Sequence, residues 1–167
     1  MATIHDADGP ADIAEIRALF VEYAQSLGVD LRFQGFDEEL ASLPGAYSRP
    51  SGCLLLAVTG ERSVGCVAVR RLDTSICEMK RLYIRPEARG QGVGRALAEA
   101  AVTFGKAAGY EAMRLDTLPT MAKAQALYRQ LGFRDVLPYR FNPIAGTAFM
   151  ELRLAKAGQP PLAADIV

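Results

Sequence analysis

The sequence lacks an excess of charge of either sign. Its 19 Lys and Arg residues balance 19 Asp and Glu residues over 167 positions. A chain without net charge has no overall field that would attract nucleic acid or an anionic membrane surface. We therefore expect no nucleic-acid partner, and positive charge can matter only where it is locally clustered.

Long apolar runs and targeting segments are also missing. No window holds the roughly 20 apolar residues that a membrane-spanning helix needs, and the first residues lack the basic region and apolar core of a secretory signal. Half of the residues are hydrophobic and 23% are charged, as in soluble globular proteins. We expect a cytoplasmic protein without membrane contact, with a single domain over residues 1–156 and a loosely held tail at residues 157–167.

Patterns for metal binding and disulfides are absent as well. The three cysteines, Cys53, Cys66 and Cys77, lie in separate apolar segments, without a CxxC pair or a nearby histidine. Such cysteines are best explained as buried, reduced thiols. We expect no metal site, and we expect the lone histidine, His5, at the surface.

The most informative stretch that is present runs from Cys77 to Ala96 and joins an apolar strand to a helix. Gly90, Gly92 and Gly94 alternate there, so no side chain blocks a ligand from the backbone amides. Amides at a helix N-terminus favour an anion. Positive side chains flank the glycines: Arg85, Arg89 and Arg95. The stretch predicts a pyrophosphate site.

Two other glycine motifs do not fit this stretch. A dinucleotide-binding G-x-G-x-x-G pattern fails because Arg95 or Leu97 stands where its third glycine is needed. A P-loop fails because Arg95 and Ala96 follow Gly94 in place of Lys and Ser or Thr.

Hydrophobic periodicity predicts an alternating series of strands and helices. The expected strands lie at residues 2–6, 53–59, 64–72, 76–84, 112–118, 134–137 and 147–154, and the expected helices at residues 11–27, 37–43, 92–108 and 119–131. The order β-α-α-β-β-β-α-β-α-β-β is typical of an α/β or α+β domain, with a mixed sheet between helices on both faces.

Two segments in this arrangement resemble a known family. Arg89-Gly90-Gln91-Gly92-Val93-Gly94 is similar to the Q/R-x-x-G-x-G/A signature of the GCN5-related N-acetyltransferases, the GNAT superfamily, directly after a strand. Residues 124–133, AQALYRQLGF, resemble the A-x-x-L-Y-x-x-x-G-F segment of the same superfamily. The resemblance covers most of residues 2–154. It implies a mostly antiparallel sheet of about six or seven strands with one splayed parallel pair and helices on both faces.

The resemblance implies acetyl-CoA as the acetyl donor. Members of the superfamily hold the pantetheine arm along the strand before the glycine loop and the pyrophosphate on the loop itself. The residues at these places are Leu82, Tyr83 and Ile84 for the arm, and Arg89, Gly90, Gln91, Gly92, Val93, Gly94, Arg95 and Ala96 for the pyrophosphate. One departure is Met121, which stands where the superfamily often has a coenzyme-binding asparagine. Methionine cannot donate a hydrogen bond, so backbone groups, Thr120 or Lys123 would replace it.

Tyr128 matches the superfamily tyrosine that stands near the thiol and serves as general acid. A phenol and a thiol have similar pKa values, so we expect a nearly balanced proton transfer. The alternative is that Tyr128 only packs its helix.

Glu78 is the candidate general base. Strand alternation places it on one face with Lys80, Leu82 and Ile84, and a partly buried carboxylate there would have a raised pKa. Alternatively, Glu78 pairs with Lys80 or with an arginine such as Arg70. Some members of the superfamily receive a neutral acceptor and need no base.

Acceptor identity in the superfamily depends on the segments outside the shared motifs, here residues 31–51 and 139–146. The candidate acceptor-binding residues are Phe33, Gln34, Arg70, Lys80 and Asn142. Two basic side chains at the cleft, from a set that also includes Arg71, Arg81 and Arg140, would favour an acceptor with a carboxylate. Alternatively, Phe33 and Phe36 anchor a loop to the core, and the basic residues face solvent or hold Glu78 and Asp116.

We therefore predict an N-acetyltransferase that moves an acetyl group from acetyl-CoA to a primary amine of a small molecule, with an amino-acid-like acceptor favoured. Two alternatives remain. One is a coenzyme-binding regulatory or interaction domain without turnover, which is favoured by Met121 in place of the usual asparagine. The other is an acetyltransferase of protein N-termini or lysines. A homodimer that pairs residues 147–154 is an expectation at superfamily level.

Overall fold

The computed structural model describes residues 1–154, apart from the side chains of Phe33 and Gln34, so the predicted tail at residues 157–167 lies outside the described part. The strands are β1 (Thr3–Asp6), β2 (Cys53–Thr59), β3 (Arg62–Arg71), β4 (Ile76–Ile84), β5 (Ala112–Thr117), β6 (Arg134–Asp135) and β7 (Ala148–Arg153). The α-helices are α1 (Gly9–Leu27), α2 (Phe36–Ser42), α3 (Val93–Ala107) and α4 (Ala122–Gln130). Short 3-10 helices cover Leu31–Gln34, Gly45–Tyr47 and Pro86–Ala88.

The strands form one sheet in the order β1-β2-β3-β4-β5-β7-β6. Every neighbouring pair is antiparallel except β4 and β5, which run parallel. This arrangement confirms the predicted mixed, mostly antiparallel sheet. At the far edge, β6 pairs with only Met150 and Glu151 of β7. The predicted homodimer through β7 stays a prediction.

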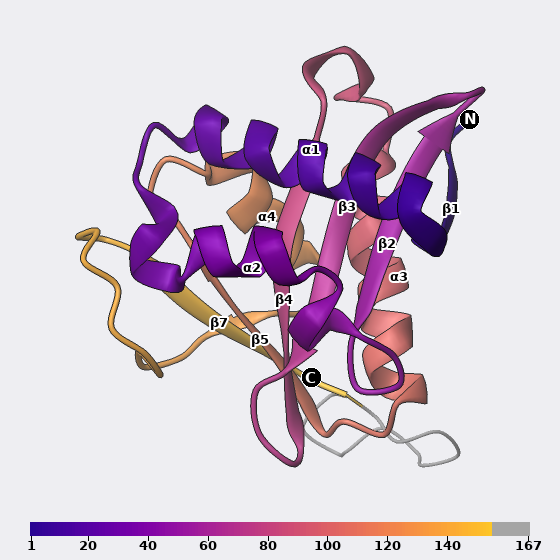
Figure 1. Cartoon of the computed structure of the whole chain (residues 1–167). Helices are drawn as coiled ribbons and strands as arrows, with labels where there is room; N and C mark the ends of the chain where they lie inside the picture. Colours follow the sequence, from indigo (N-terminus) through magenta and orange to yellow (C-terminus); the bar gives the residue numbers. More distant parts are fainter. Residues whose placement is uncertain (155–167) are drawn as a thin grey trace.

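Helices cover both faces of the sheet (Figure 1), and each face has its own apolar core. One core packs α3 and Tyr128 of α4 against the sheet, and the other packs α1 and α2. Strand β2 shows why: Cys53, Leu55 and Ala57 belong to the first core, and Leu54 and Leu56 to the second. A strand buried on both sides reads as a continuous apolar run because successive side chains point to opposite faces.

Several predicted boundaries differ from the structure by a few residues, and local features explain those of β5, α4 and β6. Strand β5 ends at Thr117 and α4 begins only at Ala122, because the carbonyl of Leu118 accepts hydrogen bonds from the Met121 amide (3.0 Å) and the Gln125 side chain (2.9 Å) in an intervening turn. Strand β6 ends at Asp135, not at residue 137, since Pro138 follows shortly and has no N–H to offer a sheet.

Other local expectations are confirmed. Gly28 ends α1 in the left-handed conformation, with φ of 63°. All three cysteines are buried free thiols, and burial raises the pKa of each. His5 is exposed and lies 3.3 Å from Asp12. No helix within residues 1–154 is long and apolar enough to cross a membrane.

Candidate active site

A cleft opens where β4 and β5 separate. The two strands pair at three positions, from Ile76 with Ala112 to Glu78 with Arg114, although β4 continues to Ile84. Figure 1 shows them together at one end of the sheet and apart at the other. The walls of the cleft include Lys80, Leu82, Asp116, Thr117, Tyr128 and Asn142. The predicted splayed pair is therefore confirmed, and the β4 edge that faces the cleft has no strand partner in the described chain beyond Glu78.

A β-bulge in β4 changes which side chains face the two layers of helices. Arg81 has φ of 61°, and it is the single non-glycine residue with positive φ in the described part of the chain. The register with β3 shifts at this point, between the pairs Ala68–Lys80 and Cys66–Tyr83. An extra residue in one strand reverses the alternation that follows it.

The bulge makes one sequence prediction wrong. Glu78 and Lys80 lie on the α1 and α2 side of the sheet, opposite to Cys77, which belongs to the α3 core. Beyond the bulge, Leu82 and Ile84 pack against the α3 core. The four side chains therefore do not share one face: two point to the α1 and α2 layer, and two point to the α3 layer.

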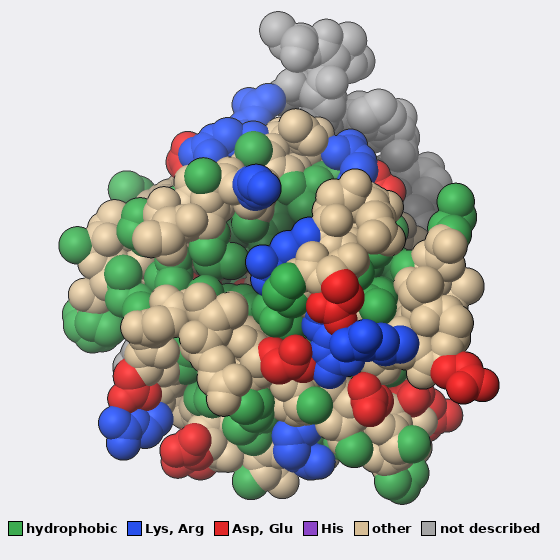
Figure 2. All heavy atoms as spheres, turned by 90° about the horizontal axis from the view of Figure 1, so that it is seen from above, with side chains coloured by type: hydrophobic (Ala, Val, Ile, Leu, Met, Phe, Trp, Pro, Cys, Tyr) green, Lys and Arg blue, Asp and Glu red, His purple; other side chains and the backbone are tan. Residues whose placement is uncertain are grey.

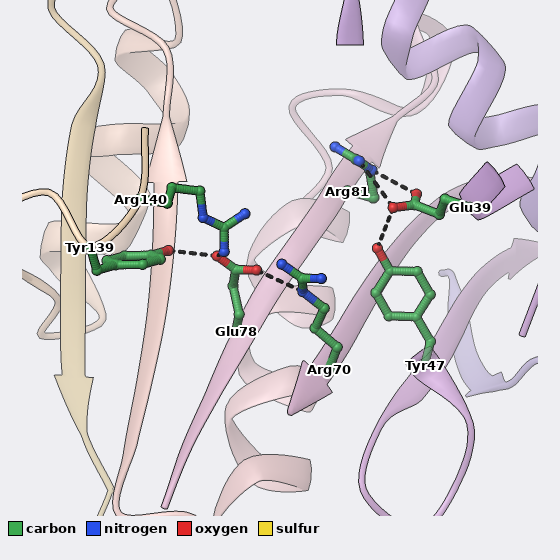
Figure 3. A network of polar contacts seen from close by, with 7 residues as sticks. All are labelled: Glu39, Tyr47, Arg70, Glu78, Arg81, Tyr139 and Arg140. Carbon is green, nitrogen blue, oxygen red and sulfur yellow. Dashed lines mark hydrogen bonds and ion pairs between the residues drawn. The ribbon is translucent and has the colours of Figure 1, made fainter. Parts of the chain in front are cut away.

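Arg81 is held by an ion pair with α2. Its guanidinium donates to both carboxylate oxygens of Glu39, at 2.9 and 3.1 Å, and the Tyr47 hydroxyl donates to Glu39 at 2.9 Å (Figure 3). The guanidinium carbon also lies 5.3 Å from the ring centre of Phe36 and 5.9 Å from that of Tyr23. These contacts stabilise an arginine backbone conformation that costs free energy on its own.

The segment that leads into α2 holds two predicted acceptor contacts, Phe33 and Gln34, and the residue that begins the helix, Phe36. The side chains of Phe33 and Gln34 lie outside the described residues, so their roles stay predictions. Phe36 is buried in the core beneath α1, which supports its alternative role of anchoring this segment.

The glycine loop leads directly into α3. Gly92 is the N-cap of α3, with φ of 80° and no side chain capping the first turn. A Cβ atom at Gly90 or Gly92 would meet nothing within 4 Å. The first-turn amides therefore lack a side-chain acceptor and the space beside the glycines is open, which fits an anionic group such as a pyrophosphate.

The side chains around the loop divide into structural and outward-facing ones. Arg85 pairs with Glu22 at 2.7 Å and donates to the Ser63 carbonyl at 2.6 Å, so it connects β3, β4 and α1. Arg89 donates to the Ile84 carbonyl at 3.0 Å but is exposed, as are Gln91, Arg95 and Ala96. Val93 is buried in the core, so only its backbone is open to a ligand. Gly94 lies against Ile84, which brings α3 close to the end of β4.

Tyr128 lies on the wall of the cleft and in the core at the same time. It is 5% exposed, and its ring lies 5.8 Å from that of Phe133. Burial raises its pKa above the ordinary value of 10, with smaller contributions from Tyr23 and Asp116. The phenol therefore holds its proton more tightly than the sequence suggested, although a thiolate formed in the same cleft would also lose hydration and become more basic.

Glu78 is fully buried and is paired on both sides. Its carboxylate lies 2.9 Å from Arg70, contacts Arg140, and accepts a hydrogen bond from the Tyr139 hydroxyl at 2.7 Å (Figure 3). Burial alone would raise its pKa, but Lys80, Arg140 and Arg70 together outweigh burial and lower it. The prediction of a raised pKa is therefore wrong, and pairing with Arg70, the alternative from sequence, is what the structure shows.

Among the polar residues of the cleft, Tyr23 and Thr117 were not predicted as site residues, and Asp116 was named only as a possible partner of the basic residues. Asp116 is half-buried, and the Asn142 side chain donates to it at 3.4 Å. The Thr117 hydroxyl is the one buried side-chain polar atom in the described residues without a hydrogen-bond partner. If the parallel register of Glu78 and Arg114 is continued by two residues, Asp116 lies opposite Lys80. Strand pairing could therefore have predicted that Asp116 lies at the cleft.

The orphaned Thr117 hydroxyl bears on whether a coenzyme arm fits here. An unsatisfied buried hydroxyl costs free energy, which a ligand can recover by hydrogen bonding. Thr117 lines the cleft together with Met121 and Tyr128. It can therefore supply the hydrogen bond that Met121 cannot.

Viewed from above, hydrophobic side chains reach the surface in the middle of the molecule, beside Lys and Arg side chains (Figure 2).

Known proteins resemble this chain over most of its length. A sequence model of the acetyltransferase (GNAT) family matches residues 12–133. An uncharacterised N-acetyltransferase of Schizosaccharomyces pombe is 40% identical over 149 residues, which cover 88% of this chain and 91% of that protein. The N-acetylaspartate synthetase of Danio rerio is 33% identical over 100 residues, which cover 59% of this chain and 36% of that protein.

The fold agrees with that of solved structures. An acetyltransferase from Salmonella typhimurium, solved with its cofactor acetyl-CoA, has a TM-score of 0.71 at 21% identity and covers 97% of this chain and 99% of that one. An acetyltransferase from Staphylococcus aureus has a TM-score of 0.76 at 20% identity, over 93% of this chain and 100% of that one. The predicted architecture is thus confirmed.

Proposed function

This chain belongs to the acetyltransferase (GNAT) family and is an acyltransferase, and we propose that it moves an acetyl group from acetyl-CoA to a primary amine of a small molecule, an amino acid or a close relative. The observation that carries the proposal is the cleft between β4 and β5, which has Tyr128 on its wall. Near its β4 end, Ile84 lies against Gly94 in the first turn of α3.

In this proposal the chain holds the coenzyme mainly with backbone. The amides from Gly90 to Ala96 would bind the pyrophosphate, and the β4 edge at Leu82, Tyr83 and Ile84 would pair with the pantetheine arm. The Thr117 hydroxyl would bond the arm in place of the asparagine that Met121 replaces. Bound acetyl-CoA supplies an acetyl group activated as a thioester.

Tyr128 is proposed as general acid, with its proton held on the phenolic oxygen. The raised pKa ensures that this oxygen is protonated at neutral pH. Glu78 as base stays a prediction, but its lowered pKa and its two arginine partners count against it. We instead propose that Glu78 holds Tyr139 and Arg140, and so fixes the segment before β7 over the cleft.

A coenzyme-release assay tests the proposal. The purified chain would be given acetyl-CoA and a panel of amino acids, polyamines and aminoglycosides, together with peptides that have free N-termini. We expect turnover on at least one small amine, and we expect Tyr128→Phe to lower kcat by about 10²- to 10⁴-fold with little change in acetyl-CoA affinity.

The outcomes separate the alternatives. Tight acetyl-CoA binding without turnover on any amine would favour a coenzyme-binding domain and refute the enzyme proposal. Turnover restricted to the peptides would move the acceptor from small molecules to protein N-termini. Full activity in Tyr128→Phe would refute the role of the phenol.

A further inference from the structure

The bulge in β4 directly precedes the strand edge that is proposed to hold the pantetheine arm. Before the bulge, β4 is paired with β5 as far as Glu78. After it come Leu82, Tyr83 and Ile84, the proposed arm-binding residues. Arg81 lies between these two parts in the left-handed conformation and lines the cleft. A bulge bends its strand, so the backbone of Arg81 sets the direction in which the arm-binding edge continues.

Beyond the bulge, the side chains of β4 are packed into both cores. Leu82 and Ile84 pack against the α3 core. Tyr83 belongs to the core beneath α1, where its ring centre lies 6.2 Å from that of Tyr23. If Arg81 returned to an extended conformation, the alternation of the strand would reverse and these side chains would leave their cores. The geometry of the arm-binding edge therefore depends on the conformation of Arg81.

Contacts from other elements hold Arg81 in this conformation. A non-glycine residue with positive φ costs free energy on its own. The Arg81 carbonyl accepts a hydrogen bond from the Cys66 thiol at 3.3 Å, and a thiol is a weak donor. The two hydrogen bonds from the Arg81 guanidinium to Glu39 are charge-assisted, which makes them the stronger kind. The pair with Glu39 is thus the stronger of these two supports.

Glu39 is itself fixed away from the coenzyme site. It lies on α2, its side chain is 15% exposed, and its carboxylate accepts a hydrogen bond from the buried Tyr47 at 2.9 Å (Figure 3). Among the described residues that line the cleft, neither Glu39 nor Tyr47 is included. Glu39 would therefore act on a bound coenzyme through Arg81.

We propose that Glu39 is a positioning residue for acetyl-CoA, because its ion pair with Arg81 holds the β4 bulge and the bulge directs the edge at residues 82–84 toward the pantetheine arm. The inference rests on the proposed function and adds a residue of α2 to it. Helix α2 belongs to residues 31–51, the segment predicted to bind the acceptor. The pair with Arg81 gives that segment a role on the donor side as well.

Acetyl-CoA binding to purified variants tests this role without an acceptor. Glu39→Ala should raise the acetyl-CoA Kd, measured by calorimetry, by about 2- to 30-fold, because the arm-binding edge is no longer held in place. With an accepted amine, kcat should fall by more, about 10²-fold, since a small displacement of the thioester is enough. Glu39→Gln keeps an oxygen that can accept from Arg81, so its Kd and kcat should lie between those of the wild type and Glu39→Ala.

A matched core variant separates positioning from loss of stability. Ile16 of α1 is fully buried in the core that α1 and α2 form with the sheet. Ile16→Ala leaves a cavity there and should destabilise the chain by a similar amount, while the pair between Glu39 and Arg81 stays intact. At a temperature where circular dichroism shows both variants folded, Ile16→Ala should bind acetyl-CoA like the wild type.

The outcomes distinguish this inference from the proposed function. If Glu39→Ala and Ile16→Ala have the same acetyl-CoA Kd and the same kcat, the inference alone is overturned. If Glu39→Ala does not fold, Glu39→Gln takes its place, and wild-type values of Kd and kcat then overturn the inference. A wild-type chain that fails to bind acetyl-CoA, or that binds it without turnover on any amine, refutes the proposed function itself.

Discussion

Removing one partner of the buried ion pair between Arg81 and Glu39 should strongly destabilise this chain. The side chains are 3% and 15% exposed. Glu39→Ala would leave the Arg81 charge in the core without its carboxylate partner Glu39. Two unit charges about 4 Å apart interact by about 4 kcal/mol at an effective dielectric constant of about 20, and removing one partner of a buried pair costs about 3–5 kcal/mol.

Chemical and thermal unfolding would measure this cost. For a chain of this size, about 3–5 kcal/mol corresponds to a fall in Tm of about 6–20 °C. The matched control is Glu87→Ala, which breaks the exposed pair with Arg62 at 2.7 Å and should cost about 1 kcal/mol or less. Adding Arg81→Met to Glu39→Ala should recover part of the loss, because the second change removes the unpaired charge.

The reasoning would be refuted if Glu39→Ala cost no more than Glu87→Ala. The reasoning would also be refuted if Arg81→Met lowered the stability of Glu39→Ala by as much as it lowers the stability of the wild type. Either result would mean that the bulge holds its conformation without the pair.

Three further predictions concern the cleft. Thr117→Val removes the orphaned hydroxyl at nearly constant shape, so the acetyl-CoA Kd should rise about 2- to 12-fold, the value of one hydrogen bond, whereas Thr117→Ser should bind like the wild type; equal Kd values in calorimetry would contradict the role. The pKa of Glu78 is lowered in the folded state, so its stabilisation is present above the unfolded value of 4.5 and is lost as pH falls through the folded pKa. Urea unfolding of Glu78→Gln between pH 3 and pH 7 should show a flatter acid side than the wild type, and an unchanged slope would count against this account. The folded pKa of Lys80 is about 8, against 10.5 in the unfolded chain. The free energy of unfolding of the wild type should therefore rise by up to about 3 kcal/mol as pH increases across that window. Lys80→Met should lack this rise, and a stability curve parallel to that of the wild type would contradict the lowered pKa.

Local sequence signals predicted most of the scaffold because they act over a few residues. The limits of β2 and β4 match the prediction at both ends, since apolar runs with turn residues on either side define strands. Gly28 ended α1 and Gly92 began α3 because both positions need positive φ. The glycine loop could be recognised for the same reason.

The bulge at Arg81 could not be predicted in this way. Arginine has no preference for positive φ, so nothing in its neighbours along the chain marks the position. The partner that stabilises it, Glu39, lies 42 residues earlier. Without the bulge, strand alternation placed Leu82 and Ile84 on the wrong face.

By itself, the sequence determined most of the strands and helices, the glycine loop at the start of α3 and the place of Tyr128 on its helix, because these follow from periodicity, glycine conformation and motif spacing. Only the tertiary structure decided how the charges in the cleft are paired. Arg140 reaches Glu78 from 62 residues further along the chain, and β4 and β5 bring Lys80 and Asp116 to opposite sides of one cleft. Electrostatic environments depend on which charges meet in space, and folding brings together groups that the sequence keeps far apart.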